Sequence, residues 1–276
     1  MDKLEDRIQK ALNADPDGLR ALLYDPSDKV VLALLSNRNI TEDEVCALAR
    51  RRDVSAEALS VIAARKMTEE GYKIRLALVN NPKTPRRAAL GQIRYLRLLD
   101  MAYLTSNKTL PTELRQLAEG VLKEKLPMIP LGVRITLARL VSEDVVKALL
   151  MDETPALVKA CFDNPRVKEG VAIWALSHEK IPGGVIRFIA ESPKWSVRYL
   201  VRFALVRNRR TPAELAVDLV CGLKSKDLRY LYNDPTVPVY VKVKIEIELE
   251  KKGEPLSPPK ETGRVVRIVE ELDEEP

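Results

Sequence analysis

Residues 74–90 read IRLALVNNPKTPRRAAL, residues 201–215 read VRFALVRNRRTPAEL, and residues 30–41 open in the same way with VVLALLSNRNIT. Each stretch has an apolar run, then an Asn, then a Thr or Thr-Pro. Apolar residues at three- and four-residue spacing are typical of a helix that buries one face. Asn, Thr and Pro favour the end of one helix and the start of the next. The repeated stretch therefore predicts a structural unit of short helices that is used several times.

The signals for helix starts are of two kinds. Thr41 with Glu44, and Thr211 with Glu214, predict capping boxes, in which the Thr hydroxyl accepts from a backbone N–H and the Glu binds the N–H of the Thr. Pro212 is expected at the first helical position, where its missing N–H leaves nothing unpaired. Other helices follow a turn in which Pro pushes the preceding residue out of the helical region. These turns are Asp25-Pro26, Ser192-Pro193 and Asp234-Pro235.

The repeats have a period that indicates architecture. Corresponding positions lie about 43 residues apart, from Asn37 to Asn80 and from Asn164 to Asn208, with shorter echoes near about 24 residues. Periods in this range are typical of stacked helical pairs. Helices of about 8–14 residues are marginal alone in water, whereas stacked pairs bury a continuous core. The sequence predicts an all-α solenoid of stacked helical pairs over residues 1–250.

Two of these units have a family resemblance. Residues 74–90 and 201–215 resemble the bacterial leucine-rich repeat variant and, more loosely, HEAT repeats; the resemblance covers most of residues 19–250. It implies a right-handed α-solenoid, that is, a superhelix of helical pairs. The variant family can carry an N-terminal iron–sulfur module with clustered cysteines. This chain has no such cluster, so no cofactor is expected.

The charge of the chain is unevenly distributed. The net charge is +6, but residues 251–276 contain more acidic than basic residues, so the body before them is the more basic part. Prolines at 255, 258 and 259 indicate a linker, and residues 251–276 are expected to be a flexible acidic tail. A basic body favours an acidic partner. The acidic run at residues 270–275 is a candidate competitor for the same surface.

The cysteines and the start of the chain bear on location. Cys46, Cys161 and Cys221 are far apart and lack CxxC spacing, which argues against a disulfide framework and a metal cluster. Buried free thiols in a reducing compartment are expected. No apolar run reaches the about 18 residues of a membrane span, and the charged start lacks the apolar stretch of a signal peptide. A cytoplasmic protein with no membrane partner is expected.

Motifs for catalysis are missing from the sequence. His178 is the only histidine, which excludes a His-based triad and a multi-His zinc site, and it is expected at the surface or at a helix end. The glycines form no phosphate-binding loop, and Gly183-Gly184 predicts a turn with positive φ. A non-enzymatic protein without a metal is expected.

Basic and aromatic residues provide the candidate binding site. Five basic residues occupy comparable places on the second helices of the pairs, which line the concave face in HEAT-like arrays. Arg198 and Arg202 are four residues apart and are expected to share a helix face, close to a group of large aromatic residues that suits an anchoring pocket. The candidate binding residues are Arg75, Arg134, Lys159, Arg198, Arg202, Trp195 and Tyr199.

These residues have two interpretations that the sequence leaves open. The basic residues either pair with acidic residues of the adjacent repeat or form a ligand-facing groove, and the aromatic residues either fill the core or contact a partner. The expected function is a non-enzymatic scaffold or adaptor that binds an acidic protein or peptide on its concave face. The alternative is a HEAT-like protein that binds nucleic acid in a basic concave groove, which would make its affinity strongly salt-dependent.

Overall fold

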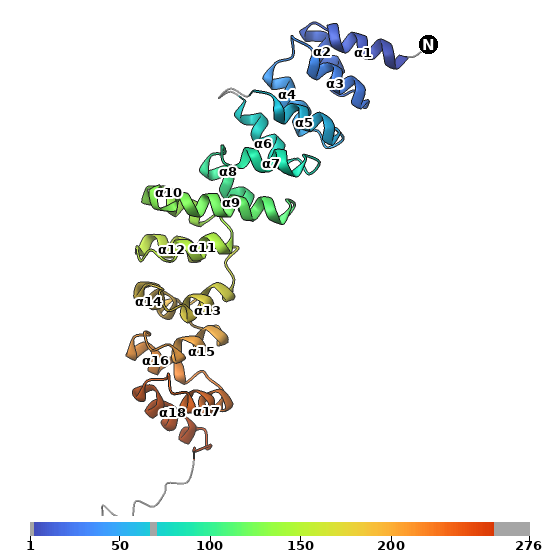
Figure 1. Cartoon of the computed structure of the whole chain (residues 1–276). Coiled ribbons are helices and arrows are strands. Elements are labelled where there is room, and N and C mark those ends of the chain that lie inside the picture. Colours follow the sequence, from blue (N-terminus) through green and yellow to red (C-terminus); the bar gives the residue numbers. More distant parts are fainter. Residues whose placement is uncertain (1–2, 67–70, 257–276) are drawn as a thin grey trace, which may run out of the picture. The chain divides into compact units, whose positions relative to one another are not determined.

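The computed structural model describes residues 3–66 and 71–256. Within these ranges the chain has eighteen α-helices, one 3-10 turn and no strand (Figure 1), which confirms the predicted all-α class. The chain divides into two compact units, Met1–Leu149 with Ala160–Arg166, and Leu150–Lys159 with Val167–Pro276. The boundary crosses α12 (Pro155–Asp163). One continuous repeat domain over residues 1–250 stays a prediction.

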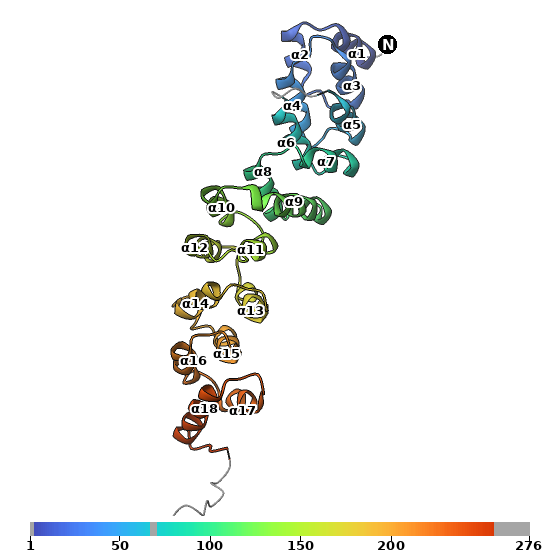
Figure 2. The ribbon, with the colours of Figure 1, turned by 60° about the vertical axis from the view of Figure 1, so that its left-hand side comes forward.

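The first unit is built from two layers of short helices. The helices α1, α3, α5, α7 and α9 lie side by side in one layer, and α4 and α6 lie side by side in the other (Figure 2). Consecutive helices such as α6 and α7 join the layers. The bounds are α1 Lys3–Asn13, α2 Pro16–Leu22, α3 Asp28–Ser36, α4 Glu42–Arg50, α5 Ala56–Ala64, α6 Tyr72–Asn80, α7 Arg86–Ile93, α8 Leu98–Ser106, α9 Thr112–Lys125, η1 Leu126–Met128, α10 Leu131–Ala138 and α11 Glu143–Leu149.

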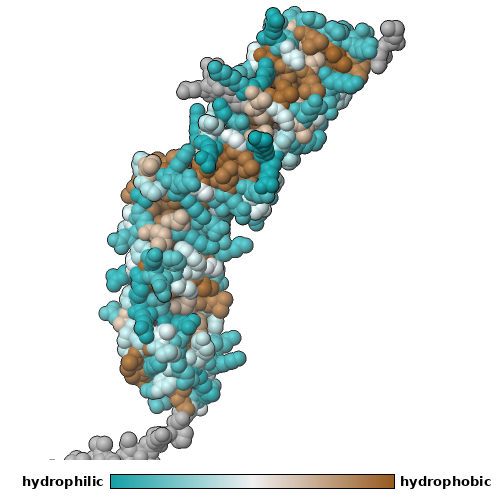
Figure 3. Space-filling view, viewed as in Figure 1, coloured by the Kyte–Doolittle hydropathy of each residue, from teal (hydrophilic) through white to brown (hydrophobic). Residues whose placement is uncertain are grey.

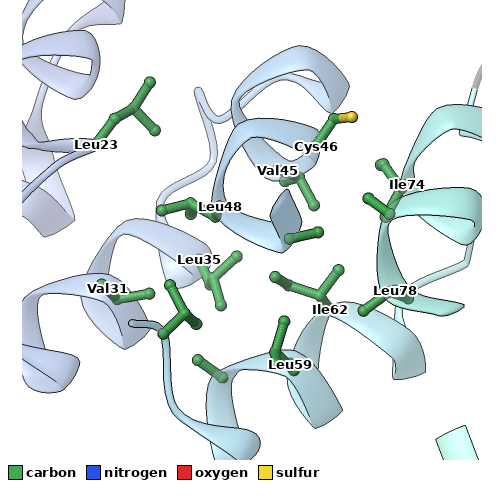
Figure 4. Packing of buried hydrophobic residues seen from close by; sticks show 14 residues of the cluster. Leu23, Val31, Leu35, Val45, Cys46, Leu48, Leu59, Ile62, Ile74 and Leu78 are labelled. Carbon is green, nitrogen blue, oxygen red and sulfur yellow. The ribbon is translucent and has the colours of Figure 1, made fainter. Parts of the chain in front are cut away.

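The core of the first unit lies between its layers. Figure 4 shows Leu35 of α3, Ile62 of α5 and Leu78 of α6 pointing toward a shared centre. All three side chains are buried. One side of the apolar run in the repeated stretch, which includes Leu35 and Leu78, is therefore buried in the core, as the helical spacing predicts.

The second unit repeats this arrangement with its own core. Here α13 lies beside α15, α16 lies beside both α14 and α18, and consecutive helices pack against each other. Val206, Leu228 and Val241 are buried in one cluster between these helices. The bounds are α13 Glu169–Ser177, α14 Gly183–Glu191, α15 Tyr199–Arg207, α16 Ala213–Val220, α17 Ser225–Asn233 and α18 Val239–Lys251.

The Asn of the repeated stretch does more than end a helix. The side-chain amide of Asn37 donates to the carbonyl of Ala11 at 2.8 Å, and its oxygen accepts from the backbone N–H of Asn39 at 2.8 Å. It therefore ties the end of α3 to the end of α1, and it is buried. Three other Asn side chains also donate to carbonyls at or near the end of an earlier helix. They are Asn81 to Ala49 and Arg51, Asn164 to Ala138 and Val141, and Asn208 to Leu176.

Of the two predicted capping boxes, the one at Thr41 is confirmed and the one at Thr211 is wrong. Thr41 and Glu44 form the capping box, with the Thr41 N–H donating to Glu44 Oε2 at 2.8 Å. The box at Thr211 is wrong, because Pro212 is the N-cap of α16 and not its first residue. The Thr211 hydroxyl, one position further out, donates instead to the carbonyl of Leu205 at 2.7 Å.

Three smaller expectations have different outcomes. The predicted positive-φ turn at Gly183 and Gly184 is wrong, because both residues begin α14. Within the described ranges the only positive φ is that of Gly253, at 72°. Cys46 and Cys161 are buried free thiols, but Cys221 is exposed. His178 is the C-cap of α13, as expected for a helix-end residue.

The first residues of the predicted acidic tail belong to the second unit. Lys251 ends α18, Glu254 Oε2 accepts from Arg229 Nη2 at 3.2 Å, and Leu256 packs against the core of the unit. The rest of the predicted tail, residues 257–276, lies outside the described residues.

Candidate binding grooves

The predicted basic residues share a register in part. Arg75, Arg134 and Arg202 are each the fourth residue of their helix, α6, α10 and α15, and the N–H of each donates to the carbonyl of the residue just before the helix. Lys159 is the fifth residue of α12 and is exposed. Arg198 is the N-cap of α15 rather than a residue within it, so the helix face expected for Arg198 and Arg202 is not formed.

Arg75 and Arg202 are engaged inside their own units. The Arg75 Nη1 donates to Gln92 Oε1 at 2.8 Å, and its guanidinium lies 4.8 Å from the centre of the Tyr95 ring. The Arg202 Nε donates to the carbonyl of Ser196 at 3.3 Å. Its guanidinium also lies against Gly222, where a Cβ would come within 1.4 Å of Nη1. Both contacts join neighbouring segments, which favours the structural interpretation of these two arginines.

Trp195 is not available as an anchor for a partner. Its side chain is only 1% exposed, which favours the core interpretation over a contact with a partner. The guanidinium of Arg198 lies 4.8 Å from the centre of its ring, and Arg198 Nη1 is 3.9 Å from Glu169 Oε2. Arg198 thus lies between a buried indole and a carboxylate.

Tyr199 takes part in a contact that the chain makes twice. The hydroxyl of Tyr199 donates to Asp227 and accepts the backbone N–H of Lys224. Tyr72 does the same with Asp100 and Arg97. Burial, together with the hydrogen bond to an aspartate, raises the pKa of each of these tyrosines above its usual value. Tyr199 is therefore a bridge between α15 and α17.

This contact reveals a longer repeat. Tyr72 and Tyr199 are the first residues of α6 and α15. The number of residues between them also separates α7 from α16, α8 from α17 and α9 from α18, counted from the first residue of each helix. The pairs of first residues are Arg86 and Ala213, Leu98 and Ser225, and Thr112 and Val239. The segments α6–α9 and α15–α18 are thus equivalent four-helix blocks.

Each block has an open groove at the same place. In the first unit the basic groove, of about 290 Å³, is lined by Arg50, Arg52, Lys73, Leu76, Ala77, Asn80 and Asn81. In the second unit the apolar groove, of about 520 Å³, is lined by Ile173, Leu176, Ser177, Leu200, Phe203, Ala204, Arg207, Asn208 and Thr236. By the same interval, three pairs of groove residues occupy equivalent positions in the two blocks: Lys73 and Leu200, Leu76 and Phe203, and Asn81 and Asn208.

The basic groove presents three cations that have no acidic partner in the described part of the chain. Arg50, Arg52 and Lys73 are exposed, and among residues 3–66 and 71–256 the side chain of none of the three makes an ion pair or a hydrogen bond. Arg51, between two of them, is different: its Nη2 lies 2.6 Å from Asp53 and 3.0 Å from the carbonyl of Asp25. The end of α4 and the loop after it therefore direct one arginine inward and two toward the groove.

The apolar groove has a hydrophobic floor and a charged edge. Leu200 is 57% exposed, and the ring of Phe203 lies 6.0 Å from that of Tyr230, which is also exposed. Arg207 Nε, at the edge, is 2.7 Å from Asp234 Oδ2. On the face shown in Figure 3, hydrophobic surface gathers in separate patches within a mostly hydrophilic surface. On this face, apolar surface is thus a local feature and not a continuous stripe.

Asp234, beside the apolar groove, predicts a pH dependence of stability. Hydrogen bonds from Thr236, together with Arg207, hold the pKa of Asp234 at about 2, below its ordinary 3.8. Because this folded-state pKa is lowered, the carboxylate stabilises the fold above about pH 4, and this contribution is lost as the pH falls toward about 2. In urea unfolding, the gap in midpoint between the unmodified chain and Asp234→Asn should shrink over that range. The exposed Asp218→Asn is the control, and a gap that stays constant would contradict the prediction.

Sequence reasoning missed the groove residues although a signal for them was present. Lys73, Leu76, Ala77 and Asn80 follow the spacing i, i+3, i+4 and i+7 on α6, and Leu200, Phe203, Ala204 and Arg207 follow it on α15. This spacing marks one side of a helix. The predicted Arg75 and Arg202 occupy another side of the same helices.

Comparisons with known proteins give no relative: no family model, no curated protein and no solved structure matches the chain. In the described part of the chain, no helix has both the length and the apolar character needed to cross a bilayer. The same residues contain no group of three or more His, Cys, Asp or Glu side chains placed to hold a metal ion.

Proposed function

We propose that the protein is a non-enzymatic scaffold or adaptor, built as a right-handed α-solenoid, that binds an acidic segment of a protein partner in the basic groove. The observation that carries the proposal is the convergence of Arg50, Arg52 and Lys73, three exposed cations with no acidic partner among the described residues. The resemblance to the leucine-rich repeat variant supports the solenoid. Free thiols at Cys46, Cys161 and Cys221 support a reducing, cytoplasmic location.

The chemistry of the basic groove suits carboxylates. Two guanidinium groups offer forked donors that match a carboxylate, and Lys73 adds a mobile point charge. Leu76 and Ala77 line the groove between these charges and give the methylene groups of a bound Glu an apolar surface. The groove therefore offers contacts to both the carboxylates and the methylene groups of the side chains of a short acidic peptide.

Nucleic acid is the weaker alternative because the positive surface is short. Lys73 also lines a second hollow of the first unit, and there Glu42 and Asp43 are its neighbours. A duplex carries one negative charge per about 1.7 Å of its axis and needs positive groups along a continuous track. Acidic residues next to the groove interrupt such a track, which favours a peptide.

The test compares three labelled probes on the full chain by fluorescence anisotropy: octaglutamate, octalysine and a 20-base-pair DNA duplex. The expected result is saturable binding of octaglutamate at physiological salt, no binding of octalysine, and weaker binding of the duplex than of octaglutamate. Tighter binding of the duplex, with a steep loss of affinity as salt rises, would instead support the nucleic-acid alternative. Absence of octaglutamate binding would contradict the proposal.

A further inference from the structure

The apolar groove has the same origin as the basic groove but a different chemistry. The interval between the blocks relates Arg50 to Ser177 and Lys73 to Leu200. It also relates Leu76 to Phe203, so that an aromatic ring takes the place of a smaller side chain. The second unit has thus exchanged all three cations of the basic groove: Arg50 for a hydroxyl, Lys73 for an apolar side chain, and Arg52 for the carboxylate of Glu179. A groove built on equivalent helices now has a hydrophobic floor.

The surroundings of the apolar groove are still positive. Arg209 Nε donates to the carbonyl of Thr236 at 2.7 Å, and Thr236 lines the groove. Arg210 Nη1 donates to the carbonyl of Glu179 at 2.9 Å, and Glu179 is two residues beyond the groove residue Ser177. Both guanidinium groups are held by backbone carbonyls, which orient the charges without neutralising them.

The third cation of the edge, Arg207, is held by a carboxylate rather than by a backbone carbonyl. Arg207 lines the groove and pairs with Asp234, and its side chain remains 48% exposed. The carboxylate of Asp234 faces the protein and is only 7% exposed. Arg207, Arg209 and Arg210 thus place three cations next to the hydrophobic floor, against two carboxylates, the mostly buried Asp234 and the exposed Glu179.

We propose that the apolar groove binds one bulky apolar side chain of a partner protein segment whose flanking residues are acidic. This inference rests on the proposed function and names the partner sequence that the second unit selects. The apolar side chain enters between Leu200 and Phe203, and the flanking carboxylates meet the arginines of the edge. Charge complementarity favours this occupant over a neutral or basic segment.

The test uses nine-residue labelled peptides with four glutamates on each side of a central residue, which is Phe, Leu, Trp or Ala. On the full chain, the Phe peptide is expected to bind about tenfold more tightly than the Ala peptide, because it buries more apolar surface. Leu200→Lys restores the residue type of the equivalent position in the basic groove and should abolish this preference. Val197→Lys, which changes an exposed valine outside the groove, should keep it.

Each outcome separates the two proposals. Equal affinity for the Phe and Ala peptides, with binding retained, overturns the apolar groove alone; no binding of any peptide in the set contradicts the proposed function as well. A Phe preference that survives Leu200→Lys places the side chain elsewhere and also overturns the inference.

Two other occupants have distinct signatures. A gain of affinity for the Phe peptide in Leu272→Ala would assign the groove to the chain's own residues 270–275. Self-association that Leu200→Lys abolishes in analytical ultracentrifugation would assign it to a second copy of the chain. Either result contradicts a partner protein as the occupant.

Discussion

Replacing Arg50, Arg52 and Lys73 together by Gln is expected to weaken the binding of octaglutamate about 100-fold. Each cation supplies a charge-assisted contact worth about 1 kcal/mol at a partly exposed site, and about 3 kcal/mol in total corresponds to roughly two powers of ten in affinity. The three side chains are exposed and make no ion pair or hydrogen bond with the other described residues. Their loss should therefore leave the unfolding transition nearly unchanged.

A matched variant separates local contact from net charge. Lys29, Arg38 and Lys108 are exposed residues of the first unit that do not line the basic groove. Replacing these three by Gln removes the same charge and is expected to change the affinity less than about threefold, the size of a screened long-range effect. Equal losses in the two triple variants would show that octaglutamate responds to net charge and that the groove has no special role.

Replacing Asn164 by Ala is expected to lower the free energy of unfolding by about 3 kcal/mol, since buried groups left without partners cost about 1–3 kcal/mol each. Asn164 is 0% exposed. Its amide donates to Ala138 and Val141 at 2.8 and 3.0 Å, and its oxygen accepts from the N–H of Arg166 at 2.9 Å. The measured quantity is the thermal midpoint of the transition that contains the first unit, which should fall by about 6–12 °C.

Two further variants test the assigned role of Asn164. Asn164→Asp keeps the size and the acceptor but cannot donate to the two carbonyls, so it should destabilise the fold at neutral pH at least as much as Ala. Asn13→Ala changes an exposed helix-end asparagine that donates only within its own helix, to Gln9 at 3.1 Å, and should cost less than about 1 kcal/mol. An Asn164→Asp variant as stable as the unmodified chain would contradict the role of the amide as a donor.

The fold was predictable from the sequence to the extent that it depends on local rules. Helical spacing located the core residues Leu35 and Leu78, and capping chemistry located the box at Thr41. The box at Thr211 failed because Pro212 precedes α16, a shift of one residue that capping preference does not resolve. The amide of Asn81 reaches a carbonyl more than thirty residues earlier, at Ala49. Such a partner depends on how helices stack, which short-range patterns do not contain.

The binding site was less predictable because side-chain direction decides it. Arg75 and Lys73 are two residues apart on α6, yet Arg75 reaches Gln92 and Lys73 lines the basic groove. Arg75 and Arg202 were predicted because they recur at equivalent positions of the repeats. An arginine that stabilises the fold in each repeat recurs in the same way. The groove residues change character between equivalent positions, as Lys73 and Leu200 do. Positions that keep the helical stripe but differ in chemistry were therefore the better signal for the residues that line the two grooves.

Hydrogen–deuterium exchange of the full chain, with and without saturating octaglutamate, tests the location of binding most directly. Slower exchange is predicted at residues 50–54, which are the end of α4 and the loop after it, and in the first turn of α6. No such change is predicted in the Arg50, Arg52 and Lys73 triple variant. Protection confined to other segments, for example around Arg134 or Lys159, with none at residues 50–54, would contradict the assignment of the basic groove as the site for an acidic partner.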